Sequence, residues 1–408
     1  MLLDRYRDLF RVPAIHATML ASIPGRLPIG IAGFAILLLV QNKSGSFITA
    51  GVASALYVLG LATVAPLVGR AIDRAGPCPV LRICALLYPV MLFALVALVN
   101  AQAHAFAIAL CAYVAGAALP PVTICMRTLY PRVLTDPALL QTAYSVDSVI
   151  VESVFVIGPA LVAMFLATGI PEGAVLLAAL AAALGTLWFM RTPAIRDWEI
   201  YPRGDSGRWG VFAEPGLVVL FLATVFYSVA FGLYEVGVTA FATRRGTPAL
   251  AGVALALASV GSALGAFAYG ARHWHAPLRK QFLIALGLMA AGSLIVAPVN
   301  NIYVFLLANL IAGAPMASVM ATQSLLLSRL APQGKLAESF TWGGTCLLGG
   351  ISGGIALGGV LAETIAPGWI LMSAACATGT AALIAMMIPH SHKLDAVGEH
   401  YVAQDGTL

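Results

Sequence analysis

The chain has 408 residues, of which 61% are hydrophobic and only 10% are charged. Soluble domains carry roughly 25% charged residues. The composition therefore excludes a soluble protein of this length, whose surface would need more charged residues. The mean hydropathy of +0.94 predicts that lipid surrounds most of the chain. The six cysteines form no CxxC pair and no histidine cluster accompanies them, so we expect no bound metal, cofactor or disulfide framework.

Twelve apolar runs are each long enough, at about 20 residues, to cross the hydrocarbon layer of a membrane. In chain order they are 14–40, 47–69, 79–99, 104–129, 139–167, 173–190, 215–241, 249–270, 281–299, 302–329, 338–362 and 367–388. Turn-forming residues, such as Lys43-Ser44-Gly45, separate several of them. The sequence therefore predicts an all-α integral membrane protein with twelve transmembrane helices.

The positive charges are distributed unevenly between the two sides that these spans define. With a cytoplasmic N-terminus, eighteen of the 22 Lys and Arg residues fall in cytoplasmic segments, and only Lys43, Arg244 and Arg245 fall in outer loops. Because positive loops stay in the cytoplasm, we expect both termini on the cytoplasmic side of a bacterial inner membrane. The +5 net charge is thus explained by topology, and no nucleic-acid partner is expected.

The longest polar stretch of the chain, 191–214, falls between the sixth and seventh spans. It predicts a cytoplasmic linker between an N-terminal six-helix bundle at 1–190 and a C-terminal six-helix bundle at 215–390. A cytoplasmic tail at 391–408 follows.

The two predicted bundles contain an internal repeat. Nine of nineteen positions are identical between 51–69 and 252–270, including the pairs Gly60/Gly261 and Gly69/Gly270. A second match relates 115–117 to 312–314 at an offset of 197. Both copies contain an even number of spans, so they have the same orientation, which is typical of parallel repeats with a substrate site between the halves.

The loop after the second span carries a recognisable motif. It reads Gly69-Arg70-Ala71-Ile72-Asp73-Arg74-Ala75-Gly76, followed by Leu81. With its position after span 2, this loop resembles the G-x-x-x-D-R-x-G-x-x-x-x-L signature of the major facilitator superfamily. The resemblance implies two six-helix bundles related by pseudo-two-fold symmetry, and transport by alternating access.

In that family the acidic and basic residues of this loop belong to a cytoplasmic charge latch. Carried over, the resemblance implies a cytoplasmic gate with a partner on the following helices, and the gate residues are Gly69, Asp73, Arg74, Gly76, Arg127 and Arg132. The second half departs from the motif, because Trp274 stands where the aspartate would be repeated. We therefore expect an asymmetric latch; the alternative is a tight turn with positive-inside charges.

Four charged residues stand out within the predicted spans, where an unpaired charge costs at least ~2.5–3.5 kcal/mol. Arg26 in span 1 and Glu152 in span 5 lie at similar depth, and these spans are neighbours in the resembled fold, so we expect them to pair. This pair either responds to protons or substrate or is a static ion pair. Asp147 is a second proton-coupling candidate or a solvated vestibule residue, and Glu235 is an outer gate or a solvated helix end.

Span 7 is crowded with aromatic residues, and span 10 contains polar ones. In the resembled fold, spans 1, 4, 7 and 10 line the cavity. The candidate substrate contacts are therefore Tyr227, Phe231, Tyr234, Asn309 and Gln323, which suit an amphipathic or aromatic substrate. The alternative is that these side chains only pack.

No ATPase signature and no clustered catalytic set is present. We therefore predict a monomeric secondary transporter, not an enzyme, that moves a small amphipathic molecule through the lipid bilayer. The Gly158-Pro159 pair in span 5 resembles a Gly-Pro motif that drug and metabolite exporters of the superfamily carry in this span. The resemblance favours efflux coupled to protons. The alternatives are uptake of a sugar or organic acid and, from another class, a non-transporting receptor or polytopic enzyme.

Overall fold

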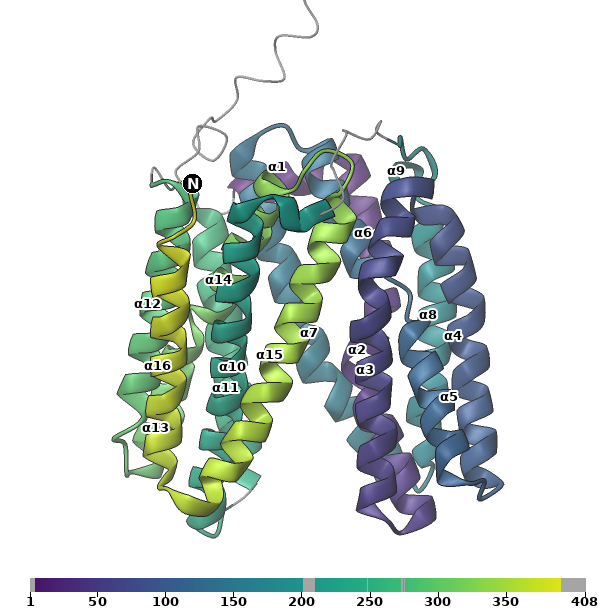
Figure 1. The fold of residues 1–408 in the computed structure, drawn as a ribbon, viewed down its shortest axis with the longest axis vertical. Coiled ribbons are helices and arrows are strands. Elements are labelled where there is room, and N and C mark those ends of the chain that lie inside the picture. Colours follow the sequence, from purple (N-terminus) through teal and green to yellow (C-terminus); the bar gives the residue numbers. More distant parts are fainter. Residues whose placement is uncertain (1–3, 201–209, 248, 273, 275, 390–408) are drawn as a thin grey trace, which may run out of the picture.

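The computed structural model describes residues 4–200, 210–247, 249–272, 274 and 276–389. Every secondary-structure element in these ranges is a helix (Figure 1). Twelve of the helical segments are long and apolar enough to cross a membrane. The expected all-α architecture with twelve membrane spans is confirmed.

The first half begins with a short amphipathic helix, α1 (Asp4–Arg11), and then contains six spans. These are α2 (Pro13–Ser44), α3 (Phe47–Ala75), α4 (Pro77–Asn100), α5 (Ala105–Ala117) with α6 (Val122–Val133), α7 (Pro137–Ala167) and α8 (Pro171–Met190). Four of the spans, α2, α4, α7 and α8, start with proline, whose fixed φ and missing N–H suit the first helical turn.

The second half follows α9 (Pro193–Arg196) and the short 3₁₀ helix η1 (Gly210–Ala213). Its spans are α10 (Pro215–Arg244), α11 (Ala249–Ala271), α12 (Leu278–Val296), α13 (Ile302–Gly313) with α14 (Met316–Leu330), α15 (Leu336–Thr364) and α16 (Pro367–Ala385).

Two spans that the sequence predicted as continuous helices are broken. The span at 104–129 is interrupted between α5 and α6, where Pro120 and Pro121 follow one another, and the span at 302–329 is interrupted before α14, at Pro315. Proline lacks the backbone N–H and its ring clashes with the preceding turn. Each break starts a new helix inside the membrane and leaves first-turn amides without helical partners.

Within each half the helices pack through small residues. Gly60 of α3 lies against the backbone of Tyr113 in α5, and Gly261 of α11 makes the equivalent contact with Leu310 in α13. A Cβ atom at either glycine would clash with that backbone. The repeated glycines therefore mark the same close helix contact in both halves, as expected of a duplicated unit.

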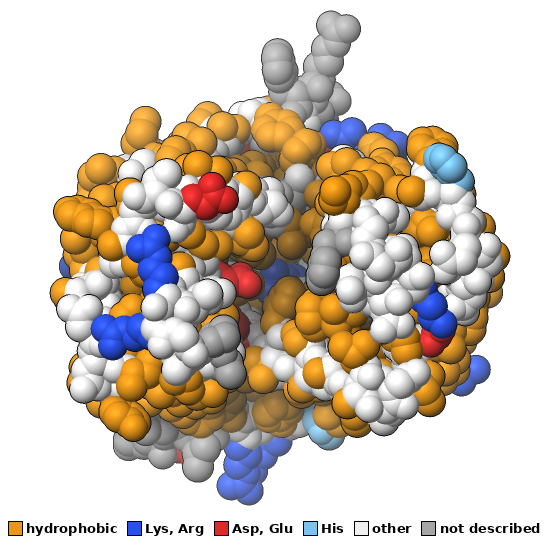
Figure 2. Space-filling model, turned by 90° about the horizontal axis from the view of Figure 1, so that it is seen from below, with side chains coloured by type: hydrophobic (Ala, Val, Ile, Leu, Met, Phe, Trp, Pro, Cys, Tyr) orange, Lys and Arg blue, Asp and Glu red, His pale blue; other side chains and the backbone are white. Residues whose placement is uncertain are grey.

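The two halves meet along α3 with α15 and along α7 with α11 and α14. Figure 1 shows that α3 and α15 approach one another at the end where α1 and α9 lie, and diverge toward the other end. We name these ends the linker face and the open face. Seen from the open face, the molecule is hollowed between its halves, and basic side chains lie deep in the hollow (Figure 2).

Candidate functional site: a cavity and two latches between the halves

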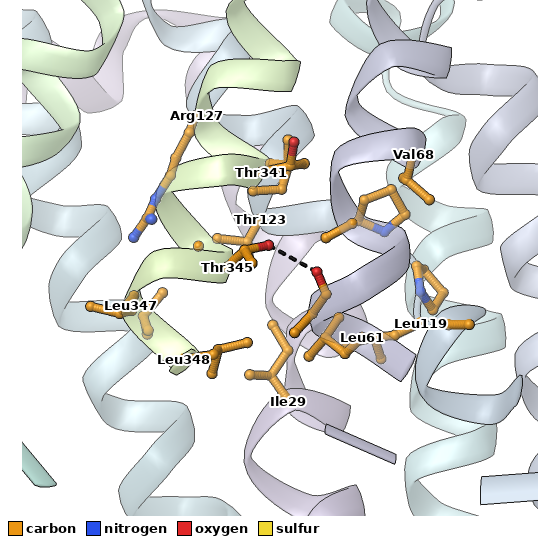
Figure 3. Close-up of a pocket in the computed structure, with 18 of the residues that line it drawn as sticks. Ile29, Leu61, Val68, Leu119, Thr123, Arg127, Thr341, Thr345, Leu347 and Leu348 are labelled. Atoms are coloured by element: carbon orange, nitrogen blue, oxygen red, sulfur yellow. Dashed lines mark hydrogen bonds between the residues drawn. The ribbon is translucent and has the colours of Figure 1, made fainter. Parts of the chain in front are cut away.

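A cavity of about 180 Å³ lies between the halves. Its wall combines residues of α2, α3, α6 and α7 from the first half with residues of α14 and α15 from the second (Figure 3). Most of the lining is apolar, and its polar members are Thr123, Arg127, Thr341 and Thr345. A space that both halves enclose is the place where relative motion of the halves changes access.

Beside this cavity lies a buried charge cluster of Arg26, Arg127, Asp147 and Tyr130. Asp147 Oδ2 accepts a hydrogen bond from Arg127 Nε at 2.7 Å, and its Oδ1 accepts one from Tyr130 Oη at 3.0 Å. Arg26 Nη1 lies 2.7 Å from the same Oδ1, although its N–H groups are not aligned for a hydrogen bond. The side chains of Arg26 and Asp147 are 1% and 0% exposed. One carboxylate is therefore shared by two guanidinium groups.

The expected pair between Arg26 and Glu152 is wrong. Asp147 takes the arginine, whereas Glu152 Oε1 accepts a hydrogen bond from Ser262 Oγ of α11 at 3.3 Å. Asp147 and Glu152 are five residues apart, so they point about 140° apart around α7. Arg26 and Glu152 were expected to pair because they lie at similar depth. The rotation of α7 about its axis instead turns Asp147 toward Arg26.

Ser262 connects Glu152 to the break in the tenth span. Its Oγ accepts a hydrogen bond from the backbone N–H of Ala317 at 3.0 Å, and Ala317 lies in the first turn of α14. The broken helix leaves this amide unpaired, and Ser262, which is fully buried, satisfies it. Glu152 therefore joins α7 of the first half to both α11 and α14 of the second.

On the linker face, α3 and α15 are joined by what we name the acidic latch, formed by Asp73, Arg70, Glu338 and the amide of Ala337. The two Asp73 oxygens accept hydrogen bonds from the backbone N–H groups of Ala337 at 3.0 Å and Glu338 at 2.8 Å. Arg70 Nε lies 2.6 Å from Glu338 Oε1. The aspartate thus caps the positive N-terminal end of a helix in the other half.

The two glycines of the motif have separate physical roles. Gly69 lies against α15, where an added Cβ would come within 2.9 Å of the Glu338 Cα. Gly76 ends α3 with φ +77°, and its N–H donates to Ile72 O. Only glycine adopts such positive φ without strain. The first glycine therefore permits close approach of the halves, and the second permits the turn that follows α3.

Three arginines of the expected gate have different positions. Arg74 is exposed. Arg132 donates to the carbonyl oxygen of Glu199 at 2.7 Å and lies over the Trp198 ring. Arg127 belongs to the buried charge cluster, not to the latch. The contact at the gate instead includes Arg70 and Glu338, neither of which was predicted as a gate residue. The sequence did place an acidic residue in the first turn of span 11 and a second arginine, Arg70, in the loop motif.

The equivalent position in the repeat, between α7 and α11, holds what we name the carbonyl latch, formed by Gln141 and Thr142 of α7 and the last carbonyl oxygens of α11. Thr142 Oγ1 donates to Gly270 O at 2.9 Å, and Gln141 Nε2 donates to Tyr269 O at 2.8 Å. Gly270 corresponds to Gly69, and a Cβ there would lie 2.8 Å from the Ser145 Cβ. No motif indicated this contact.

Helix α1 reinforces the carbonyl latch. Tyr6 Oη donates to Phe267 O at 2.7 Å, and the two rings stack with centroids 4.5 Å apart. Arg5 Nη1 donates to Arg272 O at 3.1 Å. Burial raises the pKa of Tyr6 to about 12, so its hydroxyl keeps its proton for this bond at neutral pH. The N-terminal helix therefore ties the first half to α11.

The five expected substrate contacts in spans 7 and 10 form hydrogen bonds and packing contacts inside the second half. Tyr227 Oη donates to Gln323 Oε1 at 2.6 Å, and Tyr234 Oη donates to Asn309 Oδ1 at 2.6 Å. Phe231 packs edge-on against Tyr227. Within the described residues, none of the five is part of the cavity wall. Their contact with substrate stays a prediction, and their observed role is to join α10 to α13 and α14.

Glu235 lies apart from the buried charge cluster. Its side chain is exposed and borders a groove of about 340 Å³ between α10 and α15, together with Arg244. Arg244 in turn donates to the carbonyl oxygens of Ala362 and Ile365, both at 2.7 Å, near the end of α15. This placement fits the solvated helix end that the sequence left open as an alternative.

Solved transporters share this architecture. A bacterial homologue of the iron transporter ferroportin, in its outward-facing state, has a TM-score of 0.75 at 15% identity, covering 91% of this chain and 98% of that one. The Escherichia coli fucose:proton symporter has a TM-score of 0.71 at 12% identity, with 93% and 99% covered. A human organic anion transporter has a TM-score of 0.71 at 17% identity, covering 91% of this chain and 99% of that one. These likenesses establish the fold.

Sequence comparison identifies the family. An uncharacterized MFS-type transporter of Sinorhizobium fredii is 27% identical over 306 residues, which is 69% of this chain and 72% of the relative. Residues 18–276 match the family described as the Major Facilitator Superfamily. With twelve spans, the loop motif and the repeat, the chain belongs to the Major Facilitator Superfamily.

Proposed function

We propose that this transporter exports a small amphipathic molecule by alternating access, driven by protons that move inward through Glu152. The observation that carries the alternating-access part is the position of the bonds between the halves. Within the described residues, the side-chain hydrogen bonds between the halves lie at the linker face or at mid-depth, as the bond from Thr345 Oγ1 to Ala62 O at 2.9 Å illustrates. One conformation of a two-state cycle has this arrangement.

The proposed coupling role falls on Glu152 rather than Asp147. Asp147 is held between two arginines, so its carboxylate is committed to ion pairing. Among the described residues, the Glu152 carboxyl group has one hydrogen-bond partner, the Ser262 hydroxyl. Burying a neutral carboxyl group costs far less than burying a carboxylate. Protonation of Glu152 therefore favours the closed α7–α11 contact, and proton release favours its opening.

Efflux is supported by sequence features: Gly158-Pro159 in α7 and the short 191–214 linker. Proton-coupled uptake is the second candidate, because the fucose:proton symporter has the same fold. In both cases we propose a monomer in a bacterial inner membrane, with the linker face cytoplasmic, as the distribution of Lys and Arg indicates. Lipid and protons are the proposed partners besides the substrate.

The test measures spin-label distances across each face of the protein in lipid nanodiscs. One label pair replaces Arg82 and Lys280 near the linker face, and a second pair replaces Ala101 and Glu363 near the open face; all four positions are exposed. The native thiols are first removed, because all six cysteines are free: Cys78, Cys84, Cys111, Cys125, Cys346 and Cys376.

We expect two distance populations at each face that change in opposite directions. Acidic pH should increase the population that is closed at the linker face, and Glu152→Gln should remove this pH response. Glu172→Gln is the matched control, since Glu172 pairs with Lys43 at 2.6 Å within the first half and should leave the response intact. One unchanging population at both faces would reject alternating access, and a pH response that persists in Glu152→Gln would reject the coupling role.

A further inference from the structure

The buried charge cluster carries more positive than negative charge. Arg26 and Arg127 contribute two positive charges, whereas Asp147 contributes one negative charge, and both of its oxygens are occupied. Tyr130 keeps its proton and stays neutral while its hydroxyl donates a hydrogen bond to Asp147. A surplus charge at membrane depth is costly unless it is compensated. The cluster therefore favours a second anion within reach.

The surplus charge faces the cavity through Arg127. This side chain reaches the cavity wall from α6 (Figure 3), and 15% of it is exposed. It bonds Asp147 through Nε, which leaves the two Nη groups available to an occupant of the cavity. Within the described residues, no other charged side chain lines the cavity.

Thr123 adds a neutral donor at the same wall. It precedes Arg127 by four residues on α6, so the two side chains share one face of that helix. The Thr123 hydroxyl is buried and has no hydrogen-bond partner among the described residues. Since α6 begins at Val122, the positive end of its helix dipole also lies at this level.

We propose that the transported molecule is a small organic anion, whose acidic group binds Arg127 and Thr123 and whose apolar body packs against the remaining wall. That wall contains large apolar side chains from both halves, among them Ile29, Leu61, Phe155, Leu347 and Leu348. The inference rests on the proposed transport function and narrows its amphipathic substrate to one sign of charge. Asp147 acts as a positioning residue, because it fixes the Arg127 guanidinium through Nε.

The test compares three probes with the same ring and different charge: benzoate, benzamide and benzylamine. Thermal unfolding of the purified full chain is followed in detergent, since a bound ligand stabilises the folded state. We expect benzoate to raise the melting temperature and the neutral and cationic probes to leave it unchanged. Equal shifts for benzamide or benzylamine, or no shift with benzoate up to its solubility limit, would overturn the proposal.

Variants locate the effect. Arg127→Gln leaves the Arg26–Asp147 pair balanced and should abolish the benzoate shift, whereas Arg127→Lys should retain part of it. Thr123→Val preserves shape and should weaken benzoate binding about tenfold or more, since a hydrogen bond to a charged group is lost. Arg82→Gln, at an exposed position of α4, is the matched control. Undiminished binding in both Arg127→Gln and Thr123→Val would place the anion elsewhere and reject the site.

The two experiments distinguish a failure of alternating access from a failure of anion binding. Two conformations in the spin-label distances, together with absent benzoate binding, would reject the anion alone. One fixed conformation would reject the transport cycle, whatever the probes show.

Discussion

The acidic latch and the carbonyl latch occupy equivalent places in the two halves, yet they hold the linker face closed with different chemistry. In the acidic latch, Asp73 accepts bonds from the positive N-terminal end of α15. In the carbonyl latch, the donor comes from α7, where Thr142 donates to the last carbonyl oxygens of α11. In both copies the donor belongs to the fifth span of one half and the acceptor to the second span of the other half. The backbone supplies the donors in the acidic latch and the acceptors in the carbonyl latch, and only the acidic latch depends on charge.

The α7 N-terminus explains why the second copy needs no aspartate. Asp136 caps α7 itself, because its Oδ1 accepts the N–H of Ala138 at 2.8 Å. The Ala138 amide is therefore already paired within α7 and is not available to a carboxylate from α11. Trp274 occupies the corresponding position and donates through Nε1 to Tyr269 O at 3.1 Å. A duplicated scaffold thus kept the contact and changed its chemistry.

The largest expected effect comes from filling the space at the paired glycines. At Gly69 an added Cβ meets the Thr341 hydroxyl and also backbone, with Ala337 O at 2.8 Å. At Gly270 it meets side chains, with Tyr6 Oη at 2.7 Å and Ser145 Cβ at 2.8 Å. A backbone cannot swing aside as a tyrosine can. Overpacking costs about 1–3 kcal/mol, so Gly69→Ala should lower the ratio of closed to open molecules at the linker face roughly 5- to 150-fold.

Gly270→Ala is the matched variant, and its effect on the distance between labels at 82 and 280 should be smaller. Equal opening in the two variants would show that the copies tolerate a Cβ alike, and that the backbone contact at Gly69 has no special weight.

Removing the charge of the acidic latch should have an intermediate effect. Asp73→Asn keeps an accepting oxygen but loses the attraction of a carboxylate for a helix N-terminus, which contributes about 0.3–2 kcal/mol. We expect the linker face to open roughly two- to thirtyfold more often in the same distance measurement. The control is Asp136→Asn, which caps only its own helix and replaces one good N-cap with another. Opening of similar size in the control would remove the case for a charge latch.

The smallest effect is expected from the carbonyl latch. Thr142→Val is nearly isosteric and removes a hydroxyl that lies 2.9 Å from Gly270 O and also 2.9 Å from Ala138 O of its own helix. A hydrogen bond between neutral groups contributes about 0.5–1.5 kcal/mol. Opening should increase about two- to tenfold, and added salt should not change this ratio. In the acidic latch, salt should weaken the Arg70–Glu338 pair, because Arg70 is 41% exposed.

Thr168→Val controls for the loss of a threonine hydroxyl away from the interface, since Thr168 bonds only Phe165 O of its own helix. A salt-dependent Thr142→Val effect would mean that the two latches are not chemically distinct.

The depth of a residue within its span could be predicted from the sequence more reliably than the residues that it contacts. Arg26, Asp147 and Glu152 were identified from the sequence as charges within spans. The partner predicted for Arg26 was wrong, because equal depth in adjacent helices leaves the rotation of each helix undetermined. The hydrogen bond of Glu152 to Ser262 was also beyond reach, since no pattern in a sequence marks a lone serine as a contact across the halves.

The sequence by itself determined the membrane spans, the repeat and the latch motif, because each depends on local composition or spacing: a bilayer needs about 20 apolar residues per span, and a turn with positive φ needs glycine. The tertiary structure decided which charges meet, which donor faces which acceptor in each latch, and that Arg127 lines the cavity. Those outcomes depend on how each helix is rotated when it packs, and packing is a property of the whole chain.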